Sequence, residues 1–366
     1  MNGSIDQRPD RRKQWRARYT GPDGRQHSKS WRTKVEAQRW LRGEIGKLDR
    51  GDWMDPAGGK QLLGENAPRW LDGRVRVKEK TKEWYEGILR SRILPVFGDY
   101  QLRQIDAASI RAWVTAMIED GLSPARIRHS HQVLRSILSQ AVGDGLIASN
   151  PAVGISLPRE QAREMLFLTP EQLRDLARHA DSISQGEGTL ITFLGYSGLR
   201  WSELVALKLK SVDLLNGRIE VKEAATEVGG RLVFGTPKNH RQRVVIIPKS
   251  VIRLLDDRLA VASTGDLVFT APGGGPLRNS NYRKRVWLPA IEALVLNHPH
   301  LKRLRIHDLR HTAASFAISS NANIKAVQRM LGHKNASMTL DRYSHLFTED
   351  LEELALRLDQ VYRNAA

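Results

Sequence analysis

The chain has 366 residues, of which 40% are hydrophobic and 27% are charged, a balance typical of a folded globular protein. Its 58 Lys and Arg residues outnumber 40 Asp and Glu residues, so the formal net charge of +18 favours binding to a polyanion. The sequence has no long apolar run and no signal-peptide core, which favours nucleic acid over a membrane as the partner and predicts a cytoplasmic protein. Cysteine is absent, which excludes disulfides, thiolate zinc sites and cysteine nucleophiles.

Residues 1–55 are rich in Lys and Arg and predict a small sheet with one helix. Aromatic or small residues alternate with cations over 13–19, turn residues follow at 21–24, and 26–31 can return as a second strand. Thr33 and Glu36 have the spacing of a capping box, which predicts a helix that ends near Leu48. The outer face is then either simply solvated or a DNA-binding surface, with the candidate contacts Arg16, Arg18, Arg25 and Lys29.

Residues 61–155 are predicted to form a helical domain, after a linker at 51–60 that contains Gly and Pro. Apolar residues recur at helical spacing over 81–96 and 107–120. Another helix is predicted to start at Ser123 and Pro124, which offer a cap and a first-turn proline. The pattern indicates a four-helix domain whose basic edges lie on phosphates, with the candidate contacts Arg126, Arg128 and Arg135.

Residues 165–366 combine helical patterns with short strands. Three strand-like runs, at 218–221, 231–234 and 244–247, predict one small antiparallel sheet among helices. The end of the chain has an apolar stripe typical of a helix that packs either on its own domain or on another subunit: Leu351, Leu354, Leu358 and Val361. The predicted fold class is therefore mainly α with small antiparallel sheets, that is, α+β.

Four segments of this last part carry the side chains that phosphodiester cleavage without a metal requires. Arginines hold the phosphate oxygens, a Lys or His protonates the leaving oxygen, and a tyrosine can be the nucleophile. Each residue alone is weak evidence, because isolated cations are usually surface charges and most tyrosines serve packing. The segments are 197–204 (SGLRWSEL), 236–239 (TPKN), 307–312 (HDLRHT) and 331–345, which begins LGH and ends YSH.

Together and in this order, the segments closely resemble those of the tyrosine recombinase, or phage integrase, family. The family pattern T/S-G-L/M-R-x-x-E-L is matched at 197–204, and its H-x-L-R-H pattern at 307–311. Its L-G-H motif, followed ten residues later by a tyrosine in a Y-x-H context, is matched at 331–345. The resemblance covers about residues 165–350 and implies a catalytic domain at 165–366 preceded by a core-binding domain. The basic start is similar to the arm-type DNA-binding module of the longer integrases of temperate phages.

The resemblance implies how the scissile phosphate would be held. Arg200 and Arg310 would clamp it. His307 would hydrogen-bond the phosphate and act as the base near the tyrosine, while His333 would contact a non-bridging oxygen.

The resemblance also implies the groups that make and break bonds. Tyr343 would attack to give a 3′-phosphotyrosine, Lys238 would be the general acid, and Glu203 would hold the site together. The chain departs from the family after the lysine, where Asn239 stands in place of the usual Thr or Ser. Arg241 and Arg243 are therefore alternative phosphate contacts in this segment.

No cofactor is expected, because the tyrosyl ester would keep the energy of the broken bond and the sequence has no Walker-type loop. Asp308 is interpreted as a helix-start or supporting carboxylate rather than a metal ligand. His311 and His345 are predicted to be structural.

The implied partners are double-stranded DNA at core and arm sites and three further copies of the chain in a homotetramer. A host DNA-bending protein and an excision directionality factor are also implied. Three alternatives remain open: a chromosome-resolving or transposon recombinase, a type IB topoisomerase, and a DNA-binding protein without catalysis.

Overall fold

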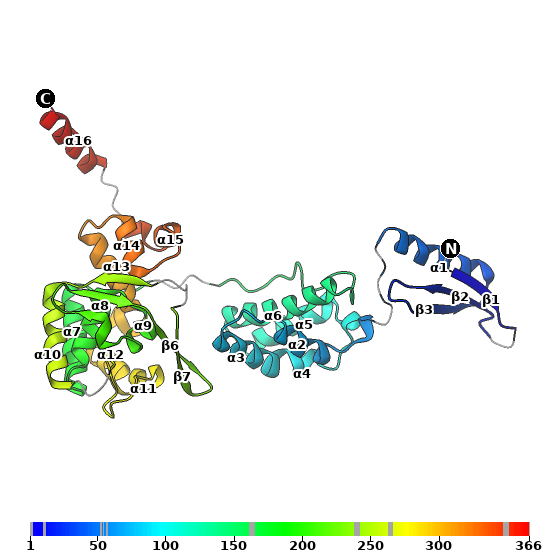
Figure 1. Cartoon of the computed structure of the whole chain (residues 1–366), viewed down its shortest axis with the longest axis horizontal. Coiled ribbons are helices and arrows are strands. Elements are labelled where there is room, and N and C mark those ends of the chain that lie inside the picture. Colours follow the sequence, from blue (N-terminus) through cyan, green and yellow to red (C-terminus); the bar gives the residue numbers. More distant parts are fainter. Residues whose placement is uncertain are drawn as a thin grey trace. The chain divides into compact units, whose positions relative to one another are not determined.

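The computed structural model describes residues 3–9, 12–51, 53, 55, 58–160, 165–237, 242–262, 266–346 and 351–365. The chain divides into two compact units, Met1–Ala162 and Arg163–Ala366 (Figure 1). Helices predominate in both units and the strands pair antiparallel, so the predicted α+β class is confirmed.

The first unit begins with a three-stranded sheet of β1 (Gly3–Gln7), β2 (Trp15–Thr20) and β3 (Gln26–Trp31), in that order. α1 (Lys34–Asp49) packs on it through Leu41 and Ala37, which meet Ala17 and Tyr19 in a small core. The capping box of Thr33 and Glu36 is present as predicted. β1 was not predicted, because its sequence GSIDQ has no alternating apolar pattern.

The helices of residues 63–143 pack around their own apolar core, which includes Trp70, Phe97 and Trp113. A π-helical segment, Leu89–Ile93, joins two of these helices and is followed two residues later by Pro95, which has no N–H for a regular helical bond. The helices are α2 (Leu63–Asp72), α3 (Glu79–Ile88), α4 (Leu94–Phe97), α5 (Ala107–Glu119) and α6 (Pro124–Gly143).

The second unit is built on a larger core to which almost every one of its elements contributes. Its last helices, α13 to α15, form a smaller cluster of their own that includes Leu331 and Tyr343. The helices are α7 (Pro170–Ile183), α8 (Glu187–Ser197), α9 (Trp201–Val205), α10 (Lys249–Ala262), α11 (Asn279–Tyr282), α12 (Leu288–Val295), α13 (Asp308–Ser319), α14 (Ile324–Leu331) and α15 (Ser337–Tyr343).

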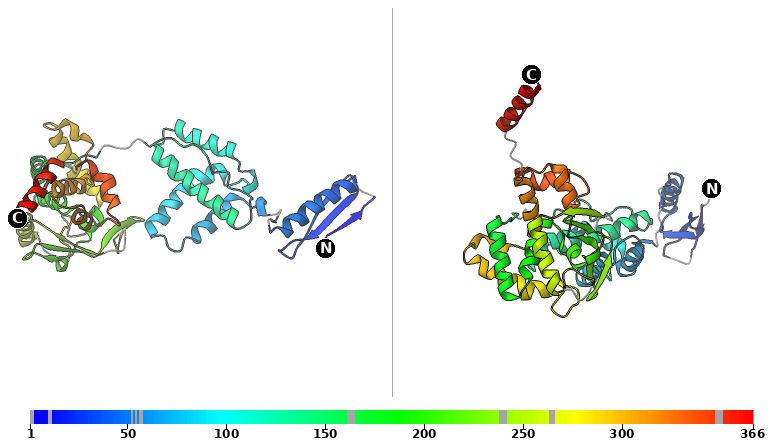
Figure 2. Two further views of the ribbon diagram at one scale, coloured as in Figure 1. Left: turned by 90° about the horizontal axis from the view of Figure 1, so that it is seen from above. Right: turned by 60° about the vertical axis from the view of Figure 1, so that its left-hand side comes forward.

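The strands of the second unit form two sheets, not the single sheet that the sequence predicts. β4 (Val212–Asp213), β5 (Arg218–Val221) and β8 (Arg243–Ile246) form one sheet in the order β4-β5-β8. β6 (Ala224–Val228) and β7 (Arg231–Gly235) form a separate hairpin, which extends from the unit in both sets of views (Figures 1 and 2). The run 231–234 is therefore a strand, but it pairs only with its neighbour in the hairpin.

α16 (Leu351–Ala365) is the final helix. Leu358 and Val361, two residues of the predicted stripe, are 60% and 66% exposed. The side chains of Leu351 and Leu354 lie outside the described residues. Within the part of the chain that the structure describes, no helix has the length and apolar character that crossing a bilayer requires.

Candidate active site

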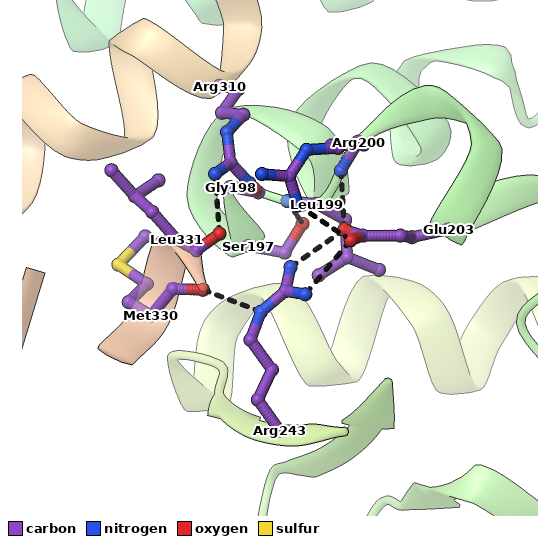
Figure 3. Close-up of polar contacts among 9 residues, drawn as sticks. All are labelled: Ser197, Gly198, Leu199, Arg200, Glu203, Arg243, Arg310, Met330 and Leu331. Carbon is purple, nitrogen blue, oxygen red and sulfur yellow. Dashed lines mark hydrogen bonds and ion pairs between the residues drawn. The ribbon is translucent and has the colours of Figure 1, made fainter. Parts of the chain in front are cut away.

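Two arginines from distant segments meet on the carboxylate of Glu203, as Figure 3 shows. Arg200 precedes α9, and its backbone N–H and Nη1 donate to the two Glu203 oxygens, each over 2.9 Å. Arg243 of β8 donates to the same two oxygens from Nη1 and Nη2, over 3.0 and 2.7 Å. Its Nε donates to the carbonyl of Met330, which ties this network to the end of α14.

Glu203 is 2% exposed and ionised. Burial alone raises its pKa, but the hydrogen bonds and charges of Arg243 and Arg200 outweigh that effect and lower it to about 2. The carboxylate thus fixes the position of Arg200, whose side chain stays 21% exposed and can still meet a ligand.

Arg310 lies in the first turn of α13 and is 3% exposed. Its Nη1 donates to the carbonyl of Gly198 over 2.6 Å, and its Nη2 donates to the carbonyl of Leu331 (Figure 3). Burial, and then the charge of Arg200, lower its pKa to about 9, so the guanidinium keeps its proton at neutral pH although its solvation is poor. A phosphate that arrived here would replace the missing solvation, as expected for a clamp.

The backbone conformation explains why glycine stands at positions 198 and 332 of the two motifs. Gly198 ends α8 with φ of 63°, and Gly332 ends α14 with φ of 65°, a left-handed conformation that other residues rarely adopt. A Cβ on Gly198 would also lie 3.0 Å from the side chain of Leu331. These turns place the two carbonyls that hold Arg310.

Two of the predicted site histidines, His307 and His333, lie near the arginines. His307 precedes α13, and its side chain is exposed to solvent on one side. Protein around the rest of the ring removes solvation, and this effect, followed by the charge of Arg310, lowers the pKa of His307 to about 4. His333 is 6% exposed, and its Nδ1 lies 3.0 Å from the hydroxyl of Thr339. Burial, and then Arg310 and Arg200, lower its pKa to about 3, so both rings are neutral at neutral pH.

Tyr343 ends α15 and is 1% exposed. Its hydroxyl lies 2.7 Å from Nδ1 of His311, a residue that is itself 4% exposed. Burial raises the pKa of Tyr343, while the charges of Arg310 and Arg342 act in the opposite direction. The tyrosine is therefore protonated at rest and lies within the field of Arg310 and Arg342.

Several predicted site residues have a different position or lie outside the structure. Lys238 and Arg241 are outside the described residues. Arg243, a predicted phosphate contact, instead has its guanidinium bound to Glu203 and Met330 and only 10% exposed. His311, predicted to be structural, contacts the Tyr343 hydroxyl; its place next to Arg310 in the H-x-x-R-H segment was the available signal.

Asp308 has the supporting position that was expected. Its carboxylate accepts hydrogen bonds from the backbone N–H of Arg305 over 2.8 Å and from Arg305 Nη2 over 2.7 Å. The carboxylate therefore organises the turn that leads into α13.

The candidate DNA contacts of the first unit fall into two groups. Arg25, Lys29, Arg126 and Arg135 are exposed. The other three are engaged within the protein. Arg16 and Arg18 pair with Asp6 over 3.2 and 3.3 Å, and Arg128 donates to the carbonyl of Pro158 over 2.9 Å.

Three family models match the chain in succession. The phage integrase family model matches residues 166–350. The model of the N-terminal SAM-like domain of phage integrases matches residues 63–118, and that of the phage integrase N-terminal domain matches residues 1–50.

Relatives and solved structures agree with these matches. The prophage phiRv2 integrase of Mycobacterium tuberculosis is 30% identical over 366 residues, covering 96% of this chain and 93% of the relative. The integrase of Mycobacterium phage D29 is 27% identical over 368 residues, covering 94% and 91%.

The fold is similar to that of the Tn1549 transposon integrase in complex with a circular intermediate DNA, with a TM-score of 0.70 at 22% identity over 81% of this chain and 99% of that one. It is also similar to a subunit of the lambda integrase tetramer bound to a Holliday junction, with a TM-score of 0.56 at 16% identity over 91% and 96%. With the site, the family models and near full-length relatives in agreement, the chain belongs to the phage integrase family and is a tyrosine-type site-specific DNA recombinase that integrates phage DNA.

Proposed function

We propose that Tyr343 attacks the scissile phosphate and forms a 3′-phosphotyrosine, with Arg200 and Arg310 as the phosphate clamp. The observation that supports this most is the position of the Tyr343 hydroxyl, buried beside His311 and within the field of Arg310. His307 and His333 are neutral and offer ring nitrogens for hydrogen bonds to the phosphate.

The bonds and protons balance without a metal or ATP. The Tyr343 hydroxyl gives its proton to a neutral histidine of the site, and its oxygen bonds to phosphorus as the bond to the 5′ oxygen breaks. That leaving oxygen takes a proton from the general acid, proposed to be Lys238. The phosphotyrosyl ester keeps the energy of the phosphodiester. A 5′ hydroxyl of another strand then reverses the step, in excision as in integration.

Tyr343→Phe is expected to abolish the covalent protein–DNA adduct on a nicked core-site substrate, while DNA binding persists. The wild-type chain should form the adduct in the presence of a metal chelator. The measurement is a denaturing gel of the trapped complex. An adduct formed by the Phe variant would overturn the choice of nucleophile.

We also propose that the three parts of the chain divide the DNA between them: 1–55 binds arm sites, 61–155 binds the core site with the catalytic part, and 165–366 cleaves. The exposed cations Arg25, Lys29, Arg126 and Arg135 support this division. Recombination between two sites would use a homotetramer, helped by a host DNA-bending protein and, for excision, a directionality factor. The chain would act on DNA in the cytoplasm of a bacterial host.

Removal of residues 350–366 is expected to reduce tetramer formation on core sites at least about tenfold and to leave binding by single subunits largely unchanged. The reason is that Leu358 and Val361 of α16 remain exposed, as a surface for another subunit would be. Native gel shifts and light scattering of the full chain and the truncated chain would measure both properties. Undiminished recombination by the truncated chain would contradict the proposal.

A further inference from the structure

His311 is placed to do more than pack. It lies in the first turns of α13, directly after Arg310, and its Nδ1 is 2.7 Å from the Tyr343 hydroxyl at the end of α15. The two rings are tilted by 60° with centroids 5.7 Å apart, so they meet through this polar contact rather than by stacking. The contact joins residues 32 positions apart in the sequence.

The protonation state of His311 gives the contact a direction. Burial, and then His307, lower the pKa of His311 to about 4, with Arg342 and Arg310 acting in the same direction and Asp308 against it. The ring is therefore neutral at neutral pH and has one nitrogen that accepts a hydrogen bond. The protonated Tyr343 hydroxyl can donate to Nδ1 when His311 carries its own proton on Nε2, and this hydrogen bond favours that tautomer.

We propose that His311, rather than His307, accepts the proton of the Tyr343 hydroxyl during cleavage. This inference rests on the proposed role of Tyr343 as the nucleophile. As the Tyr343 oxygen bonds to phosphorus, its proton moves to Nδ1 of His311, and the leaving 5′ oxygen takes a different proton from the general acid. In rejoining, His311 returns the proton to the tyrosine.

The position of His311 beside the clamp supports this role. Tyr343 is buried, and its hydroxyl meets His311 inside the protein. His311 directly follows Arg310 on α13, so the base lies beside the guanidinium that is proposed to hold the phosphate. His307, whose ring lies 5.3 Å from that of His311 and nearly perpendicular to it, is then free to hydrogen-bond the phosphate.

The test is single-turnover cleavage of a nicked core-site substrate by the full chain and by His311→Asn. The Asn side-chain oxygen can take the place of Nδ1, so the variant keeps an acceptor for Tyr343 but loses the base. The rate of adduct formation should fall about 100-fold or more, with DNA affinity unchanged. A ring-fluorinated tyrosine at position 343 loses its proton more readily. In the His311→Asn variant it should therefore raise the rate of adduct formation at least about tenfold.

His307→Asn serves as the matched control, because its rate should fall without rescue by the fluorinated tyrosine. If His311→Asn does not fold, the fluorinated tyrosine in the wild-type background still tests the idea, since it should reduce the dependence of the cleavage rate on pH. Wild-type or faster cleavage by a folded His311→Asn, or a loss that the fluorinated tyrosine does not restore, would overturn the role of His311. An adduct missing in the wild-type chain would instead refute the proposed role of Tyr343.

Discussion

Glu203→Gln is expected to lower the free energy of unfolding of the catalytic unit by about 3–5 kcal/mol, the usual cost of removing one partner from a buried ionic network. Glu203 accepts four hydrogen bonds from Arg200 and Arg243 and is 2% exposed. An amide has no charge to balance these two cations, and its NH₂ group would face their donors. Calorimetric unfolding of the full chain, following the transition of the catalytic unit, would measure the loss.

The same network predicts a pH dependence. Because the pKa of Glu203 falls from 4.5 to about 2 on folding, its contribution is complete above about 4.5 and is lost as the pH falls toward 2. A shift of this size corresponds to a few kcal/mol, on the order of 3, at neutral pH. The difference in stability between wild type and Glu203→Gln should therefore be largest at neutral pH and shrink in acid.

Glu220→Gln is the matched control, because Glu220 pairs with Lys222 on the exposed face of β5 and its side chain is 47% exposed. Its loss should cost no more than about 1 kcal/mol. Equal losses in the two variants would show that the buried network adds nothing beyond a surface ion pair.

The sequence predicted the elements that depend on local signals. Thr33 and Glu36 mark the start of α1, because capping depends on residues three positions apart, and Ser123 and Pro124 mark the start of α6. The candidate site residues could also be named from the sequence, because they lie in recognisable motifs: Arg200, His307, Arg310, His333 and Tyr343.

What the sequence did not predict depends on long-range contacts. Strand-like runs at 218–221, 231–234 and 244–247 do not reveal their partners, so they predict one sheet where the structure has a sheet and a separate hairpin. Arg243 is one of several cations after Lys238, and only the fold places it on Glu203, 40 residues away. His311 lies a single residue from the motif arginine, but its contact with Tyr343 spans 32 positions.

Arg310→Ala is expected to lower the rate of adduct formation about 100- to 1,000-fold, the range found when one fixed donor to a developing charge is removed. Arg310 is held by the carbonyls of Gly198 and Leu331, so its guanidinium is already oriented before DNA binds. Single-turnover cleavage of the nicked core site, measured with DNA in excess, separates this loss from weaker binding.

Two variants identify the cause of the loss. Arg310→Lys keeps a positive charge but loses the planar guanidinium. In Arg310 that group bonds both carbonyls and also presents donors to a phosphate, so the rate of the Lys variant should lie between those of wild type and Arg310→Ala. Arg178→Ala removes a surface arginine of α7 that is 73% exposed, and it should cleave at the wild-type rate. If Arg310→Lys cleaved as fast as wild type, charge alone would account for the clamp, and the two carbonyls that orient Arg310 would have no part in catalysis.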